Sequence, residues 1–235
     1  MQFARSLLFT IFLFTWTAIV AVTFGLLGWI PSRAQRSACA HGWGSVLLWA
    51  LKTICRLDYR VEGRENLPAG NHVALVKHAS SWETFAQAVL LPPQAWVLKR
   101  ELTWIPFVGL CVKHLRAISV NRGAGQVAVK SVLAQGSRRL AEGLWIVIFP
   151  EGTRMPPGQT RKYGISGAML AVENDRCIVP VAHNAGYFWP RRGLLKRPGT
   201  IRVRIGKPIP AAGRDPRQIN AEAQAWIEAN SQLED

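Results

Sequence analysis

Residues 73–84, VALVKHASSWET, and residues 146–154, IVIFPEGTR, are two short apolar runs that each end abruptly in polar, chemically capable side chains. Runs of this kind are typical of buried strands in an α/β sheet, where ligands bind beyond the carboxyl ends of the strands. The first run delivers His78, and Glu83 follows five positions later. Ser80 and Glu83 have the Ser-x-x-Glu spacing of a capping box, which predicts that a helix begins here. The two stretches therefore predict one site at the edge of a sheet.

The first stretch predicts a histidine that is oriented by a carboxylate. An imidazole on the loop and Glu83 in the first helical turn can share a hydrogen bond through one ring nitrogen, which leaves the other nitrogen free to accept a proton. His78 would then serve as a general base near neutral pH. A structural histidine beside a capping glutamate has the same spacing, so this stretch alone does not decide between the two interpretations.

The second stretch favours catalysis. Residues 149–154, FPEGTR, place a carboxylate, a glycine, a hydroxyl and a guanidinium on one turn after a strand. This set of groups suits the binding of a phosphate and its neighbouring hydroxyls.

Together the motifs resemble those of the glycerolipid acyltransferase family, which includes the 1-acylglycerol-3-phosphate acyltransferases. The family's Phe-Pro-Glu-Gly-Thr-Arg motif is intact here, and its His-x4-Asp motif is matched with Glu83 in place of the usual Asp. A third family motif, a β-type run that ends in Arg, is matched by residues 117–122, AISVNR, without the usual aromatic residue. A Pro-containing apolar run at residues 178–181 matches a fourth. The resemblance covers about residues 57–209.

The resemblance implies an α/β fold like that of glycerol-3-phosphate acyltransferases, with a mixed sheet flanked by helices and preceded by a membrane-associated helix pair. The residues agree, because strand-type and helix-type segments alternate from residue 57 to a closing helix at residues 216–230. We therefore expect membrane-associated helices in residues 1–55 and a catalytic domain in residues 56–235.

Residues 7–30 contain no charged side chain. As a helix they would be about 36 Å long, enough to cross a hydrocarbon core about 30 Å thick. A cleaved signal peptide is the competing interpretation, but this apolar run is too long for one. Residues 37–55 predict a second, amphipathic helix, so the pair either includes a spanning helix or forms a hairpin that enters one leaflet.

The formal net charge of +15 implies a polyanionic partner. An anionic membrane and phosphate-bearing substrates fit, whereas nucleic acid does not, because the basic residues are not interleaved with a stacking aromatic platform. The cysteines and histidines lack the spacing of a metal site, and we expect no metal or cofactor.

The resemblance implies transfer of a fatty acyl group from a thioester donor, acyl-CoA or acyl-carrier protein, to the sn-2 hydroxyl of 1-acylglycerol 3-phosphate (lysophosphatidic acid), giving phosphatidic acid. His78 would be the base and Glu83 would orient it. Another acceptor, such as a lyso-aminolipid or glycerol 3-phosphate, would keep all the motifs, and a hydrolase would use the same base with water. We expect the enzyme at the inner membrane, with its catalytic domain facing the cytoplasm.

The remaining site assignments concern binding. The resemblance implies that one group of residues holds the phosphate and glycerol of the acceptor: Arg122, Glu151, Gly152, Thr153 and Arg154. Three cations are candidates for contact with the acidic donor: Lys99, Arg100 and Lys162.

Three expectations concern packing. Residues 104–113 predict a helix or re-entrant segment whose apolar side chains either line a groove or belong to the core. Residues 125–142 predict an amphipathic helix with Val127, Val132 and Leu140 turned inward. The other histidines, His183 among them, have no carboxylate at a useful spacing and are expected to be structural.

Overall fold

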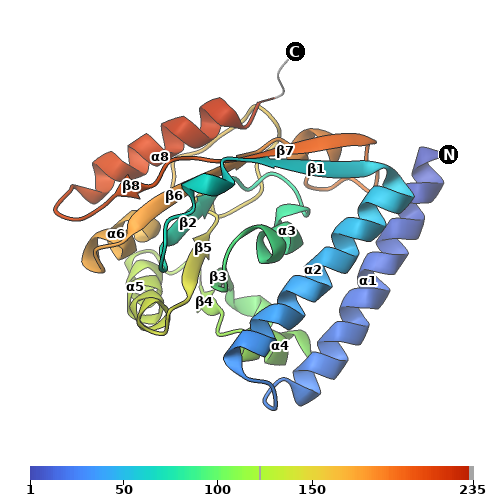
Figure 1. Cartoon of the computed structure of the whole chain (residues 1–235), viewed down its shortest axis with the longest axis horizontal. Coiled ribbons are helices and arrows are strands. Elements are labelled where there is room, and N and C mark those ends of the chain that lie inside the picture. Colours follow the sequence, from blue (N-terminus) through green and yellow to red (C-terminus); the bar gives the residue numbers. More distant parts are fainter. Residues whose placement is uncertain (122, 233–235) are drawn as a thin grey trace.

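The computed structural model describes residues 1–121 and 123–232. Within them, eight strands form one sheet: β1 (Leu57–Glu62), β2 (Val73–Val76), β3 (Gln94–Lys99), β4 (Ile118–Val120), β5 (Trp145–Ile148), β6 (Cys177–His183), β7 (Gly199–Ile205) and β8 (Ile209–Pro210). The order is β1-β7-β6-β2-β5-β3-β4, and β8 pairs with β6 (Figure 1). β6 is antiparallel to β7 and β8, while the other pairs are parallel, which confirms the expected mixed sheet.

Helices cover both faces of this sheet (Figure 1). They are α1 (Gln2–Leu27), α2 (Arg33–Cys55), α3 (Glu83–Leu90), α4 (Val108–His114), α5 (Gln126–Ala141), α6 (Ser166–Glu173), α7 (Ala185–Phe188) and α8 (Pro216–Asn230), with 3₁₀ turns η1 (Arg64–Asn66) and η2 (Arg100–Trp104). The short elements α7 and β8 were not predicted, because they are too short to show a hydrophobic period.

The strands that carry the two motifs are buried on both faces. On β2, Val73 and Leu75 point to a hydrophobic cluster shared with α5, α6 and α8, while Ala74 and Val76 point to a second cluster shared with α1, α2 and α3. This two-sided burial explains why residues 73–76 form a continuous apolar run instead of an alternating one.

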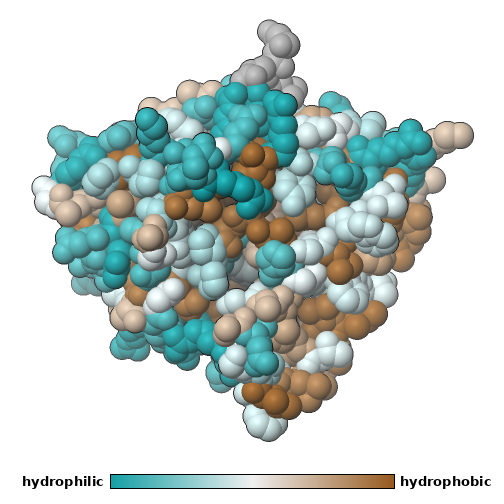
Figure 2. All heavy atoms as spheres, viewed as in Figure 1, coloured by the Kyte–Doolittle hydropathy of each residue, from teal (hydrophilic) through white to brown (hydrophobic). Residues whose placement is uncertain are grey.

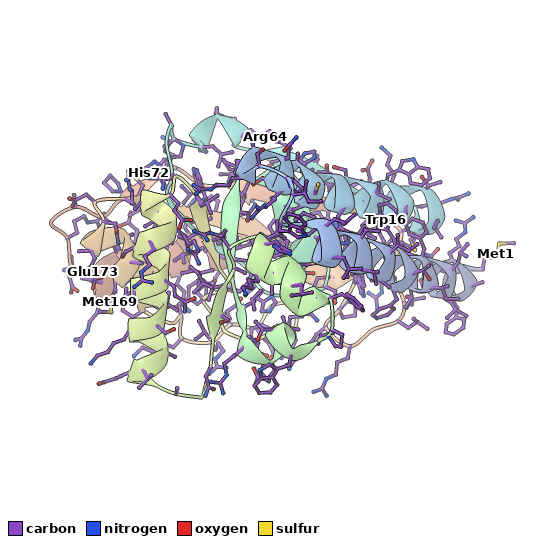
Figure 3. The ribbon with its side chains drawn as sticks, turned by 90° about the horizontal axis from the view of Figure 1, so that it is seen from below. Met1, Trp16, Arg64, His72, Met169 and Glu173 are labelled. Atoms are coloured by element: carbon purple, nitrogen blue, oxygen red, sulfur yellow. The ribbon has the colours of Figure 1, made fainter. Side chains whose placement is uncertain are left out.

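The N-terminal helix pair packs into the second cluster. Phe9 on α1 and Leu47 and Leu51 on α2 are fully buried among residues of the sheet and α3. Figure 3 shows the pair from below, with Met1 and Trp16 to one side of the sheet and His72 and Glu173 at the other end. Because the pair shares a hydrophobic core with the sheet and α3, the division at residue 55 stays a prediction.

Helix α1 is long and apolar enough to cross a membrane. It begins at Gln2, ahead of the expected residue 7. It ends at Leu27 and not at the expected residue 30, because Gly28 and the next residues form a turn. α2 begins at Arg33, ahead of the expected residue 37, because Ser32 and Gln35 form a complete capping box.

Two packing expectations are corrected. Val127 is 68% exposed, whereas Val132 and Leu140 are buried, so only the latter two lie on the inner face of α5. Residues 104–113 do not form one helix: η2 ends at Trp104, and α4 starts at Val108 after a bend at Phe107. Pro106 lies in this bend, and a proline disfavours helical conformation in the residue before it.

Candidate active site

The two motifs meet at one edge of the sheet. β2 and β5 are adjacent and parallel, with Val73 opposite Ile146 and Leu75 opposite Ile148, so their carboxyl ends lie side by side. The Met155 N–H donates a hydrogen bond to the His78 carbonyl oxygen at 2.7 Å, which links the segments that follow the two strands.

His78 and Glu83 form the expected pair. His78 Nδ1 lies 2.9 Å from Glu83 Oε1. Because a carboxylate only accepts, Nδ1 carries the proton and Nε2 is left unprotonated. The imidazole also stacks on the Phe149 ring, with centroids 4.3 Å apart and an interplanar angle of 20°. The ring is therefore held by a hydrogen bond at one edge and by an aromatic face.

The Glu83 carboxylate is buried and accepts several hydrogen bonds. Besides the imidazole, the N–H groups of Ala79 and Ser80 donate to it at 2.9–3.1 Å. Burial alone would raise its pKa, but the hydrogen bond from His78, the electrostatic interactions with His183 and His78, and the Ser80 N–H together hold the pKa of Glu83 below its ordinary value. Glu83 therefore remains an ionised acceptor for the ring.

The prediction of a capping box at Ser80 and Glu83 is confirmed only in part. Glu83 reaches back to the Ser80 N–H, as such a box requires. The Ser80 hydroxyl, however, accepts from Trp82 N, and the helix begins at Glu83 itself, with Trp82 in the N-cap position.

Glu151 is turned into the protein. The His78 N–H donates to Glu151 Oε2 at 2.6 Å, and Lys77 Nζ lies 2.7 Å from Oε1. Burial and, to a smaller extent, the nearby charge of Glu228 raise the pKa of Glu151 to about 7, against the lowering effect of Lys77 and the His78 N–H. These contacts give Glu151 a role in holding the backbone at His78, while the acceptor contact expected from the sequence stays a prediction.

Sequence reasoning missed the cation behind this carboxylate. Lys77 Nζ lies 2.8 and 2.7 Å from the two carboxylate oxygens of Glu228 on α8. The Tyr163 hydroxyl donates to the same carboxylate at 2.7 Å. A lysine at the end of an otherwise apolar strand was a signal for a buried acidic partner, but nothing local pointed to Glu228.

His183 also lies beside the pair. Its Nε2 donates to the Lys77 carbonyl oxygen at 2.9 Å, its Nδ1 accepts from Ala185 N, and Nε2 is 3.8 Å from Glu83 Oε2. Burial lowers its pKa. The expectation of a structural histidine agrees with these contacts. No carboxylate lies at a useful spacing from His183 in the sequence, but the fold brings Glu83 close to it.

An open cleft of about 340 Å³ adjoins the pair. Phe149 connects the two, because it stacks on His78 and also lines the cleft. Its other lining residues include Gly125, Gly152, Arg161 and Lys162. Among the donor candidates, Lys162 therefore lies at the cleft, whereas Lys99 pairs with Glu101 and Arg100 lies over the Trp104 ring.

The remaining turn residues have distinct surroundings. Gly152 has a φ of +68°, a conformation that favours glycine. Thr153 and Arg154 are half-buried. Arg154 Nε is buried and has no hydrogen-bond partner among the described residues. Arg122 lies outside the described residues.

Comparisons with known proteins show the family of the chain. The sequence model of the acyltransferase family matches residues 58–184, which include His78, Glu83 and the whole FPEGTR turn. The chain is 38% identical over 233 residues to a 1-acyl-sn-glycerol-3-phosphate acyltransferase of Pseudomonas aeruginosa, covering 96% of this chain and 90% of that protein.

The chain belongs to the acyltransferase family. A plant relative with the same name, from Cocos nucifera, is 25% identical and covers 87% of this chain and 65% of its own length. The crystal structure of the lysophosphatidic acid acyltransferase from Thermotoga maritima has the same fold, with a TM-score of 0.79 at 21% identity, and covers 97% of this chain and 95% of that one. The acyltransferase match excludes α1, α2 and α8, so Glu228 lies outside the residues that the family model covers.

Proposed function

We propose that this acyltransferase moves a fatty acyl group from a thioester donor to the sn-2 hydroxyl of 1-acylglycerol 3-phosphate, giving phosphatidic acid. The observation that carries the proposal is the 2.9 Å contact between His78 Nδ1 and Glu83 at the end of β2, beside the FPEGTR turn. Acyl-CoA and acyl-carrier protein are the candidate donors. Both are acidic, and the net charge of +15 favours their approach.

The proposed reaction uses the His78 ring nitrogen that does not contact Glu83. His78 Nε2 takes the proton of the acceptor hydroxyl as its oxygen attacks the thioester carbonyl. Glu83 stabilises the imidazolium that forms. The carbon–sulfur bond then breaks, the thiolate leaves with the proton from Nε2, and the products are an ester and a free thiol. The sequence contains no Gly-x-Ser-x-Gly nucleophile motif, which favours direct attack over an acyl-enzyme.

Arg154, Gly152, Thr153 and Arg122 are proposed to hold the phosphate and glycerol of the acceptor. The unpartnered Nε of Arg154 supports this role, because a buried guanidinium N–H without an acceptor is costly unless a ligand supplies one. Lys162, at the cleft, is the first candidate for donor contact.

The protein associates with the membrane through its apolar N-terminal helix. We propose that α1 lies in one leaflet, because both of its ends are fixed to the catalytic domain: Ser6 accepts from Lys196 N near its start, and Gly25 accepts from His114 near its end. A helix held in this way cannot cross the bilayer without drawing the domain with it. The proposed location is the inner membrane with the domain facing the cytoplasm, where cysteines stay reduced and the anionic leaflet attracts basic protein.

The direct test is an assay of the purified full-length enzyme with labelled acyl-CoA and acyl-carrier protein. The acceptors are 1-acylglycerol 3-phosphate, glycerol 3-phosphate, a lyso-aminolipid and an unphosphorylated monoacylglycerol. We expect the first acceptor to give the highest kcat/KM. A higher value with another lyso-acceptor would reassign the acceptor, and release of free fatty acid without an acceptor would indicate a hydrolase.

The Arg154→Ala variant tests whether this arginine binds the phosphate of the acceptor. Loss of a charge-assisted contact of about 1.5 to 3 kcal/mol lowers kcat/KM for the phosphorylated acceptor roughly ten- to a hundredfold, and Arg154→Lys restores it only in part, since an ammonium lacks the bidentate fork. Arg60→Ala, an exposed arginine on β1, is the control. Equal proportional losses with phosphorylated acceptor and monoacylglycerol would show that Arg154 does not bind the phosphate.

A further inference from the structure

The segment from η2 to α4 exposes a group of large apolar side chains that the fold does not cover. Trp104 is 66% exposed, and the other members are between 37% and 46% exposed. We call this group the α4 face: Leu102, Trp104, Ile105, Phe107 and Leu110. In a soluble protein, clustered exposure of this kind marks an interaction surface.

The α4 face is continuous with the exposed side of α1. Cys111 Sγ donates to the Ala21 carbonyl oxygen at 3.3 Å, and Phe24 makes an edge contact with the His114 ring. A Cβ added at Gly25 would come within 3.0–3.3 Å of Phe107, so the two backbones approach closely at this point. In Figure 2 hydrophobic surface extends over the lower right of the molecule, where Figure 1 places α1 and α4.

The outward residues of this part of α1, and of the turn that follows it, are also apolar and exposed. Ile19, Leu26, Trp29 and Ile30 are all at least 50% exposed. Because α4 is packed rigidly against this stretch of α1, any surface that covers the outer side of α1 meets the α4 face as well.

Cations border the α4 face. Lys99, Arg100 and Lys113 are exposed at its margins, and Arg100 lies over the Trp104 ring, 5.7 Å from its centroid. An apolar centre with a basic margin and an exposed tryptophan is the composition that suits the boundary between acyl chains and anionic headgroups.

The α4 face lies at the same edge of the sheet as the candidate active site. β3 and β4 run parallel to β5, so the segment after β3 lies at the same edge of the sheet as His78. An open cleft of about 660 Å³ lies behind the face, lined by Trp104 and Leu110 and by Leu98 and Ser119 from the strands.

We propose that the α4 face is a second membrane-contact surface, which enters the same leaflet as the outer side of α1 and holds the His78 edge of the sheet against the bilayer. The proposal requires membrane association but not a particular reaction. The enzyme would then be anchored at two elements, which fixes its orientation as well as its distance from the lipid.

The test attaches the environment-sensitive fluorophore NBD to a cysteine introduced in place of Leu110, in full-length protein in which the exposed Cys39 and the half-buried Cys111 and Cys177 are replaced by alanine. The matched control carries the label at Glu173, which is exposed at the end of α6 and lies at the opposite end of the molecule from Met1 and Trp16 (Figure 3). On vesicles of phosphatidylcholine and phosphatidylglycerol we expect NBD at position 110 to brighten severalfold, to shift to shorter wavelength and to be quenched by spin-labelled acyl chains. NBD at position 173 should remain in its aqueous state.

Two results would overturn the proposal. One is an aqueous spectrum at position 110 while flotation shows that the protein is bound to the vesicles. The other is a shift produced by acyl-carrier protein and not by vesicles, which would make the face a protein docking site. Neither readout depends on catalysis, so failure of the proposed reaction is distinguishable from failure of this inference.

A kinetic arm uses Leu102→Ser with Leu110→Ser. We expect kcat/KM for acceptor in vesicles to fall about three- to tenfold, while kcat/KM for a short-chain acceptor below its micellar concentration is unchanged. Equal losses with both acceptors would place these residues in the substrate site or the core and would overturn the membrane assignment.

Discussion

Two buried carboxylates, Glu83 and Glu151, contact His78, and their pKa values are shifted in opposite directions. Glu83, in the first turn of α3, meets the imidazole and the backbone N–H groups of Ala79 and Ser80, and its pKa is lowered. Glu151, on the turn after β5, meets the His78 N–H and Lys77, and its pKa is raised to about 7.

The difference comes from the neighbours and not from burial, which both share. Glu83 is surrounded by donors, whereas Glu151 shares its one cation, Lys77, with a second carboxylate, Glu228. The comparison separates two tasks: Glu83 sets the protonation and direction of the ring, and Glu151 sets the position of the backbone that carries it. The following predictions test this division, beginning with the largest expected effect.

His78→Ala removes the imidazole that Glu83 orients and whose backbone Glu151 holds. Loss of the general base should lower kcat by about a hundred- to ten-thousandfold, with the protein still folded and membrane-bound. The measurement is steady-state acyl transfer, with circular dichroism and flotation to follow folding and binding. His41→Ala, an exposed histidine on α2, is the control and should keep full activity. A folded His78→Ala enzyme with wild-type kcat would refute the assignment of the base.

Glu83→Gln tests the carboxylate at the ring. The amide loses the charge that stabilises the imidazolium, so we expect kcat to fall about ten- to a thousandfold while the KM of the acceptor changes little. Glu83→Asp should be milder, because it keeps the charge and restores the family's usual residue. A Gln variant that folds and retains kcat, or an Asp variant that is equally damaged, would contradict an electrostatic role.

The contact between Glu83 and His78 could be predicted from the sequence because the two residues are close together in the chain. His78 and Glu83 are five residues apart at a strand-to-helix junction. The alternation of strand-type and helix-type segments likewise predicted an α/β domain, and the family resemblance implied that its sheet is mixed. What the sequence could not show was which way Glu151 turns, since a carboxylate on a loop after a strand can face either a ligand or the core. The Lys77–Glu228 pair and the approach of His183 to Glu83 join residues about 100 or more positions apart, and no local pattern encodes such contacts.

Glu151→Gln tests the second carboxylate through pH. Its folded pKa, about 7, lies above the ordinary 4.5, so the folded protein binds this proton more tightly than the unfolded chain. The resulting stabilisation is fully present below pH 4.5 and is lost as pH rises through about 7. The free energy of unfolding of wild type, relative to the Gln variant, should therefore fall by at most about 3 kcal/mol between about pH 5 and about pH 8. Denaturant unfolding in detergent measures it, and parallel pH profiles would show that Glu151 is not the group responsible.

Glu228→Gln should have the smallest effect, since its carboxylate reaches His78 only through Lys77 and Glu151. Lys77 keeps its contact with Glu151, so we expect kcat to fall only about two- to fivefold with KM unchanged. The more specific outcome concerns pH: the negative charge of Glu228 contributes to the raised pKa of Glu151, so its removal should move the pH-dependent loss of stability to lower pH. Glu222→Gln, on the same helix but exposed and paired with Arg214, is the matched control and should leave both kcat and the pH profile unchanged. If Glu228→Gln lowers the melting temperature but leaves the pH profile where it is in wild type, then α8 only supports the fold, and the charge state of Glu151 is set by Lys77 and burial alone.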